Sequence, residues 1–305
     1  MIAFVVSAAL AQSCSCSVGG GGGALPSASV VMPGMVVASV ETSMGVVGGD
    51  GWRGFEWTDR LGNSMPTMAM PGHRSQTATT TLLYGLPKGF ALSAGIPLIH
   101  AVPLFPSDMR GDVERTFLGD TSVMGRWVQF RDQFGTALAL GATLPTGKVV
   151  PGNGVRGGRG VVGVTLGAHA AYEVSPYATL GLATTFVSDL RTPKDGYRVA
   201  DTAGATLGAR FTPRERGKIG LLAYGLFRWE GHDRSGTYVL DETGYVAIDA
   251  LTGFQWRFWA HRMQSMTWTT RAQVPLWQVV GDPWIAQNYS VTTGLALAFG
   301  TSPTP

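Results

Sequence analysis

Apolar residues alternate with small or polar residues along most of the chain from Gly34 onward. A period of two residues predicts β-strands, because successive side chains of a strand point to opposite faces. The segment 265–277 shows this pattern most clearly. Met266, Trp268, Ala272, Val274 and Leu276 share one face, and Thr267, Thr269, Arg271 and Gln273 share the other. One face of such a strand suits lipid and the other suits water.

Twelve segments show this alternation, some of them more weakly than others. Short turns such as 86–89 and 132–135 alternate with longer stretches such as 148–160 and 190–201. Outer-membrane barrels have short periplasmic turns, long external loops and even strand numbers. The sequence therefore predicts an all-β fold, an antiparallel up-and-down transmembrane β-barrel of about twelve strands. The expected strands are 34–47, 73–85, 89–100, 119–131, 138–144, 162–173, 178–186, 203–211, 217–230, 246–258, 265–277 and 287–300.

Composition agrees with a membrane barrel. Charged residues make up 14% of the 305 residues, well below the roughly 25% of an average soluble protein. Beyond the N-terminus, no run reaches the roughly 18 consecutive apolar residues that a membrane-spanning helix needs. The net charge is only +3 and the Lys and Arg residues are scattered, which argues against nucleic acid as a partner. We expect the outer membrane of a Gram-negative bacterium as the location, with outer-membrane lipid as a partner.

The N-terminus has features of an exported protein. Residues 1–11 form an apolar run that ends in Ala9-Leu10-Ala11, the small-x-small form that signal peptidase cuts. No Lys or Arg precedes this run, which leaves a start upstream of Met1 open. We predict a signal peptide at 1–11, a flexible Gly-rich leader at 12–33, the barrel at 34–300 and a short tail at 301–305.

Cys14 and Cys16 are the only cysteines, and three interpretations of them stay open. Cys14 could carry a lipid, although Ala11-Gln12-Ser13 lacks the usual Leu of a lipobox. The two thiolates could bind a metal, although they supply only two soft ligands. They could also lie in an unstructured leader around the cleavage site.

The last expected strand ends on an aromatic residue. Tyr289, Val291, Leu295, Leu297 and Phe299 share one face, a pattern typical of the C-terminal signal that the barrel-assembly machinery reads. We therefore expect this machinery as a partner. The aromatic residue is commonly the last one of the chain, and here the tail follows it.

Three short motifs carry a resemblance to a known family. They are Leu83-Tyr84-Gly85-Leu86 leading into Gly95-Ile96-Pro97, then Leu118-Gly119-Asp120-Thr121-Ser122, then Leu144-Pro145-Thr146-Gly147-Lys148 before a Gly-rich loop. In their order and spacing the chain resembles the outer-membrane transporter family of the meta-pathway of phenol degradation. The resemblance implies a barrel that moves small, often hydrophobic compounds, without implying phenol as the solute. It supplies no site residues.

Two nucleotide-binding motifs are misleading. The run 152–157 has the glycine spacing of a dinucleotide fingerprint, which requires a following helix, whereas another alternating strand follows here. Gly147-Lys148 is similar to a phosphate loop, but Val149 stands where Ser or Thr is needed. We expect no organic cofactor.

An unusual group of soft ligands lies in one expected external loop. Met65, Met68, Met70 and His73 place three thioethers and one imidazole within nine residues. Thioethers select Cu(I), and imidazole also suits copper. Transient copper capture is therefore one hypothesis, and loose packing of the Met side chains is the alternative.

The alternation also predicts which charged residues face the lumen. Basic side chains outnumber acidic ones in this set, which would favour anionic solutes. A strand register wrong by one residue would exchange the faces, and structural ion pairs inside a narrow barrel are an equal alternative. The residues are Arg126, His169, Glu173, Arg210, Arg228, Asp249, Arg257, Arg271 and Gln273.

The predicted function is passive passage of small solutes, hydrophobic or anionic, through an outer-membrane channel that is not an enzyme. One alternative is a structural or adhesive surface β protein, and a soluble β-sandwich would show the same alternation. Another is an outer-membrane lipase or deacylase, which needs a Ser and a His whose side chains meet. Ser265 and Ser290 show no recognisable pairing with any of the five His residues.

Overall fold

The structure is a computed structural model. It describes residues 33–47, 57–58, 64–65, 73–103, 115–147, 158–192, 196–213, 218–232, 234–235, 237–239, 244–261, 264–280 and 287–300. The predicted signal peptide, nearly all of the leader with its two cysteines, and the tail lie outside these residues. The predicted division of the chain into these parts therefore stays a prediction.

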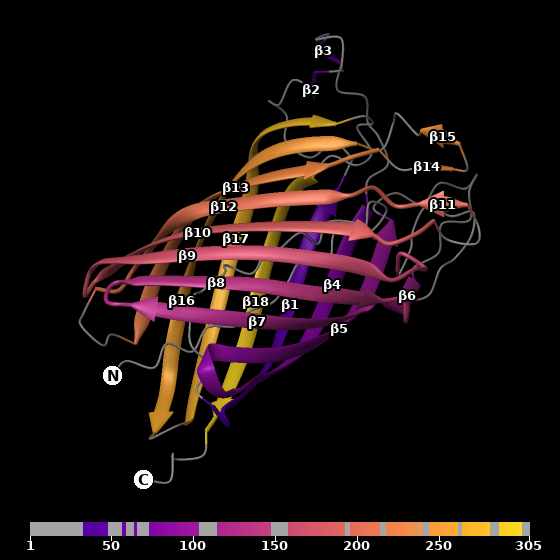
Figure 1. Cartoon of the computed structure of the whole chain (residues 1–305). Helices are drawn as coiled ribbons and strands as arrows, with labels where there is room; N and C mark the ends of the chain where they lie inside the picture. Colours follow the sequence, from indigo (N-terminus) through magenta and orange to yellow (C-terminus); the bar gives the residue numbers. More distant parts are fainter. Residues whose placement is uncertain are drawn as a thin grey trace.

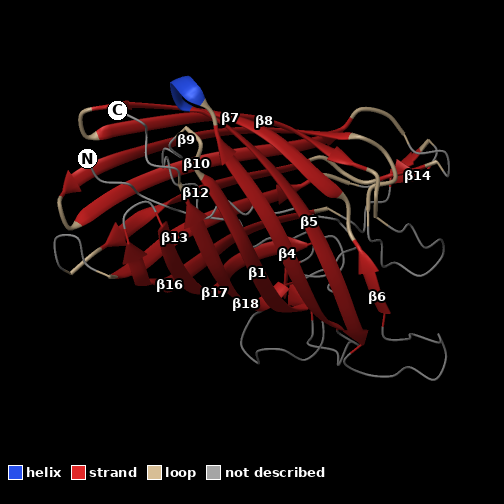
Figure 2. Cartoon of the chain, turned by 90° about the horizontal axis from the view of Figure 1, so that it is seen from below, coloured by secondary structure: helices blue, strands red, loops and turns tan. Residues whose placement is uncertain are grey.

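The long described strands form one closed barrel (Figures 1 and 2). All neighbouring strands are antiparallel, and long strands consecutive in the chain are neighbours in the sheet, with β4–β5 and β1–β18 completing the ring. The predicted up-and-down barrel is thus confirmed. Its long strands are β1 (Val36–Val47), β4 (His73–Gly85), β5 (Phe90–Pro103), β7 (Thr121–Arg131), β8 (Phe134–Leu144), β9 (Gly163–Ser175), β10 (Ala178–Asp189), β12 (Thr202–Phe211), β13 (Ile219–Glu230), β16 (Tyr245–His261), β17 (Gln264–Val280) and β18 (Gln287–Phe299).

One strand of the ring is interrupted. The short strand β6 (Arg115–Leu118) pairs with β5 at 98–101, and β7 pairs with β5 at 90–95. The backbone N–H of Gly119 donates to the carbonyl of Pro97, so that the ladder continues across the break. Because β6 and β7 together form one strand, the thirteen-stranded sheet has twelve positions around the ring. The expected strands 89–100 and 119–131 left residues 101–118 as a connection, which was wrong at 101–103, part of β5, and at 115–118, which form β6.

The two faces of the barrel wall differ as the alternation predicts. Large apolar side chains on the outer face are exposed, such as Leu140 at 62% and Leu207 at 65%. Aromatic residues are exposed near both rims, among them Trp127 and Trp229. The inner face is buried and mixes small, polar and charged side chains. A closed ring with an apolar outside rules out the β-sandwich.

Short turns connect neighbouring strands at one end of the barrel, which we call the turn end. The 3-10 helix η1 (Pro87–Gly89) joins β4 to β5, with a positive φ of 61° at Lys88 and 80° at Gly89. A Cβ at Gly89 would collide with the carbonyl oxygen of Val128, so glycine is required there. Asp132, in the next turn, has φ 53°. In the described part of the chain, no helix is long and apolar enough to cross a membrane.

Longer connections leave the strands at the opposite end, which we call the loop end. They carry short strands that the alternation did not predict, and these lie beyond the barrel wall in Figure 1. These strands are β2 (Trp57–Thr58) paired with β3 (Ser64–Met65), and β11 (Tyr197–Arg198) paired with β14 (Arg234–Ser235), which also pairs with β15 (Tyr238–Val239).

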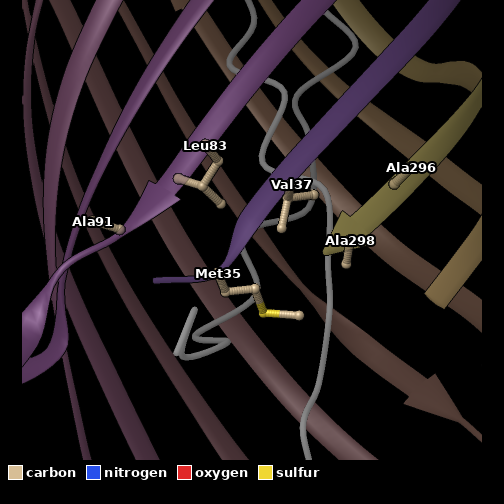
Figure 3. Close-up of a cluster of buried hydrophobic side chains, with 6 residues drawn as sticks. All are labelled: Met35, Val37, Leu83, Ala91, Ala296 and Ala298. Carbon is tan, nitrogen blue, oxygen red and sulfur yellow. The ribbon is translucent and has the colours of Figure 1, made fainter. Parts of the chain in front are cut away.

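An apolar cluster covers the inner face near the turn end (Figure 3). Its side chains come from neighbouring strands and from the residue just before β1. The members are Met35, Val37, Leu83, Ala91, Ala296 and Ala298, and each is at most 4% exposed. We call these six residues the apolar cluster.

Candidate functional site: the inner face of the barrel

Two groups of polar and charged residues lie on opposite sides of the inner face. Acidic and basic side chains pair along β1, β13, β16 and β17. We call Glu41, Arg228, Asp249, Arg271 and Gln273 the ion-paired wall. Across the ring, β7, β8 and β9 carry Arg126 and His169 among small residues.

Asp249 is the centre of the ion-paired wall. Its side chain is fully buried, and Arg228 binds both of its oxygens through Nε at 2.6 Å and Nη2 at 3.0 Å. Gln273 Nε2 donates to the same carboxylate at 2.8 Å, and Ser290 Oγ donates to Gln273 at 3.4 Å. The guanidinium also lies 5.3 Å from the ring centre of Tyr245. A polar chain therefore links β13, β16, β17 and β18.

A second ion pair crosses the place where the first strand, β1, meets the last strand, β18, which we call the seam. Arg271 Nη2 on β17 donates to Glu41 Oε1 on β1 at 2.5 Å, although β18 lies between these strands. Gly294 on β18 is the cross-strand partner of Glu41, and a Cβ there would lie 3.4 Å from the Glu41 side chain.

The described residues supply no such partner for Arg126. It is 6% exposed on the inner face of β7, and its Nε and Nη2 atoms are buried without a hydrogen-bond partner among the residues that the structure describes. Ala91 and Ala139 are its cross-strand neighbours. His169 lies on the inner face of β9, with its Nδ1 also buried and unpaired in the described structure.

The other predicted lumen residues also lie on the inner face by strand register. Arg210 is near the turn end and packs over Gly220, where a Cβ would lie 3.1 Å from Nε. Glu173 and Arg257 are half-buried at inward positions of β9 and β16. That all these residues line a solute path stays a proposal.

Glu41, Tyr245 and Ser290 were missed as members of the site. Alternation in 34–47 places Glu41 on the same face as Ser39 and Ser43, so its face was predictable. Its partner was not, because strand order and register decide which residue lies opposite.

A separate hydrogen-bonded group holds the loop end. Asp120 accepts from the backbone N–H of Gly147 at 2.8 Å and of Arg159 at 2.6 Å. The Arg159 side chain donates from Nε to Asp189 at 2.5 Å and from Nη2 to the carbonyl of Ala200 at 2.7 Å. We call these five residues the loop-end clamp. They connect the break after β6, the β8–β9 connection and the β10–β12 connection.

Asp120 lies in the break between strands, where burial shifts the pKa of its carboxyl. Burial raises the pKa of its carboxyl above the ordinary value, and the hydrogen bonds from Arg159 and Gly147 act in the opposite direction. A Cβ at Gly158 would collide with this carboxylate, so glycine there lets the chain approach it.

Hydrogen bonds at and beside the loop-end clamp connect the three sequence motifs. Gly119 bonds to Pro97, Asp120 bonds to Gly147, and the N–H of Thr121 donates to Thr146 Oγ1 at 2.8 Å. Residues from three separate motifs thus meet at one point near the loop end. The motifs therefore hold the wall and its connections together.

The copper hypothesis stays a prediction. Met68 and Met70 lie outside the described residues, and only the backbone is described for Met65 at β3 and His73 at the start of β4. Within the described ranges, no three His, Cys, Asp or Glu residues are grouped as a metal site.

The hydrolase alternative finds little support in the geometry. Ser290 on β18 donates to Gln273, whereas His169 on β9 lies on the opposite side of the ring. His100 Nδ1 lies 2.8 Å from Thr116 Oγ1 near the loop end. Ser265 is inward-facing on β17, also across the ring from β9.

Comparison with known proteins supports the fold. No family model matches the chain, and no curated protein matches it. Among solved structures, the COG4313 outer membrane channel from Pseudomonas putida F1 aligns with a TM-score of 0.70 at 14% identity, over 88% of this chain and 97% of that one. The CymD monoaromatic hydrocarbon channel (0.43, 10% identity, 89% of each chain) and the Ralstonia pickettii toluene transporter TbuX (0.42, 8% identity, 89% and 90%) are too distant to inform the argument.

The first of these likenesses bears out the coarse part of the family resemblance, an outer-membrane channel fold, and leaves the phenol-degradation family itself without support. A closed barrel leaves no unpaired strand edge in lipid, and its apolar outer face suits a bilayer. The chain has the twelve-stranded fold of an outer-membrane channel, and this fold indicates the bacterial outer membrane.

Proposed function

We propose that this protein is a passive outer-membrane channel for small solutes. The observation that supports this proposal is the contrast between the two faces of the barrel wall. Lipid-compatible side chains cover the outside, while the inside carries many charged and polar residues together with the apolar cluster near the turn end. A polar interior is typical of outer-membrane barrels that conduct solutes.

The size of the barrel limits what can pass. Eight strands leave an interior that side chains fill, whereas sixteen leave an aqueous channel. Twelve strands lie between these cases, so the passage is narrow and its lining residues come close to any solute. Inward glycine and alanine residues occupy much of the wall across from the ion pairs, including Ala137, Ala139 and Gly167.

The ion-paired wall supports this function by keeping its own side chains in place. Asp249 receives hydrogen bonds from Arg228 and Gln273, and Glu41 receives one from Arg271. Charges held in pairs present little net charge to a solute. Selectivity then depends on basic residues such as Arg126, for which the described residues supply no acidic partner, and this favours anionic over cationic solutes.

The experiment is reconstitution of the purified, full chain. A heat-dependent shift in gel migration identifies the folded barrel, and the same sample is then used in planar bilayers and liposome-swelling assays. We expect discrete conductance steps with a reversal potential that indicates anion preference, and protein boiled before reconstitution serves as the control. A folded barrel that passes neither ions nor small neutral or anionic solutes would contradict the proposal and favour a structural or adhesive protein.

A further inference from the structure

Arg126 stands apart from the charged residues of the ion-paired wall. Arg228 and Arg271 each bind a carboxylate on a nearby strand. Arg126 is buried to a similar degree, 6% exposed against 5% for Arg271, yet its Nε and Nη2 have no partner among the described residues. A buried charge without a counter-ion is costly, and an anion that binds there removes this cost.

Among the described residues, the neighbours of Arg126 on its own and the adjacent strands supply no acidic group. Ala91 and Ala139 are directly opposite on the two adjacent strands, and Met124 and Val128 precede and follow it on the inner face of β7. Alanine on both sides leaves the guanidinium room to turn into the lumen. A guanidinium presents its N–H groups as a fork that matches the two oxygens of a carboxylate.

His169 adds a second donor to the same place. Gly167 on β9 lies in register with Ala139, which in turn faces Arg126. A Cβ at Gly167 would lie 3.5 Å from Nε2 of His169, so the imidazole extends over Gly167 toward the level of Arg126. Its Nδ1 is buried and unpaired in the described structure. Arg126 and His169 therefore flank β8 and face the same part of the lumen.

The surroundings of this pair are apolar on the β5 side. Ala91, the cross-strand neighbour of Arg126, belongs to the apolar cluster, and Figure 3 shows Leu83 on the adjacent strand, with Val37 and Met35 one strand further. Arg126 is paired with Ala91 on β5, and Ala91 is paired with Gly85 on β4. The backbone N–H of Gly85 donates in turn to the carbonyl of Met35, so these residues lie at one level of the wall. A solute held at Arg126 would have an apolar surface next to its charged end.

We propose that Arg126 and His169 form a binding site for the carboxylate of a small solute whose remaining part is apolar and packs against the apolar cluster. This inference rests on the proposed channel function and names the class of solute. Glu173 is the nearest acid on β9, two inward positions beyond His169 toward the turn end. The acids Glu41 and Asp249 are bound by arginines of the ion-paired wall.

Equilibrium binding to the purified barrel in detergent tests the site directly. The probes are cyclohexanecarboxylate, its neutral isostere cyclohexanecarboxamide, and acetate, which has the charge without the apolar body. We expect isothermal calorimetry to show the carboxylate binding at least about tenfold more tightly than the amide or acetate, the difference that one charge-assisted hydrogen bond supplies.

Substitutions at the site should remove this preference. We expect Arg126→Met to weaken carboxylate binding at least about tenfold and to leave the amide unchanged, whereas Arg126→Lys keeps part of the preference. His169→Gln should weaken binding by a smaller factor. Arg131→Met removes an exposed arginine of the same strand and is the matched control, with wild-type binding expected. The heat-dependent gel shift verifies that each variant is folded.

The outcomes separate the site from the channel. Carboxylate binding that is equal in wild type and Arg126→Met, or equal for the acid and the amide, would overturn the inference even if the protein conducts. Binding that depends on Arg126 would support the site, and a protein that binds but passes no solute in liposomes would contradict only the channel function.

Discussion

The carboxylate of Asp120 accepts a 2.6 Å hydrogen bond from the backbone N–H of Arg159, a residue 39 positions further along the chain. Asp120 is 1% exposed and lies where the strand made of β6 and β7 is interrupted. The same carboxylate accepts from Gly147. One side chain thereby fixes both ends of the long β8–β9 connection to the barrel wall.

Replacing Asp120 should loosen the loop end while leaving the barrel closed. Asp120→Asn keeps one acceptor oxygen and turns an NH₂ group toward a backbone donor, which we expect to cost about 1–3 kcal/mol of unfolding free energy. The measurement is urea unfolding of the lipid-reconstituted protein, with limited proteolysis to locate the loosened segment. Asp132→Asn, in an exposed turn, makes the same chemical change and should have little effect. Equal stability of the two variants would contradict a clamp at Asp120.

The ion pair between Glu41 and Arg271 should stabilise the seam between the first and last strands. Arg271→Met leaves Glu41 without its ion-pair partner, and we expect the free energy of unfolding to fall by about 3–5 kcal/mol. Glu41→Gln combined with Arg271→Met removes both charges and should cost less than the sum of the single changes, by about 1–3 kcal/mol. A double-mutant cycle from unfolding curves measures this coupling. Strict additivity would show that the pair contributes nothing specific to closure.

The strands could be predicted because alternation is a local property of the sequence. All twelve expected segments correspond to strands of the ring, and the predicted faces agree with the observed burial. The β6–β7 interruption could not be predicted, since Gly119-Asp120 has the composition of an ordinary turn. Only the hydrogen bond from Gly119 to Pro97, in a different segment, shows that the strand continues.

The composition of the inner face was predictable, but its pairing was not. Alternation assigns a residue to a face and says nothing of its height in the barrel or of its neighbours. Arg228 and Arg126 therefore look alike in sequence, although one binds Asp249 and the other has unpaired nitrogens among the described residues. Strand order and register, which only the folded ring specifies, make this difference.

Two glycines that are direct cross-strand partners should respond differently to the same substitution. Gly208 on β12 faces Gly181 on β10. A Cβ at Gly208 would collide with the backbone carbonyl of Ala223 and with the ring of Tyr224, whereas the nearest atom at Gly181 is 4.0 Å away. We expect Gly208→Ala to cost about 1–3 kcal/mol through overpacking and Gly181→Ala to change stability by no more than about 0.5 kcal/mol. Unfolding curves in one lipid compare the two, and similar losses would exclude the contact with Tyr224 as the cause.

A charge on the outer face should reveal which part of the barrel lies in the hydrocarbon core. Leu140 lies toward the middle of β8 and Leu190 just beyond the end of β10, and both are strongly exposed, at 62% and 67%. We expect Leu140→Arg to cost about 2–4 kcal/mol, because arginine near the bilayer midplane is poorly solvated, and Leu190→Arg to cost about 0–1 kcal/mol near the interface. The fraction of heat-shifted protein after refolding into vesicles, followed over urea concentration, measures both. Detergent micelles adapt around a charge, so the difference in stability between the two variants should shrink there. A difference of the same size in micelles would point to a local packing defect at Leu140 instead of its depth in the membrane.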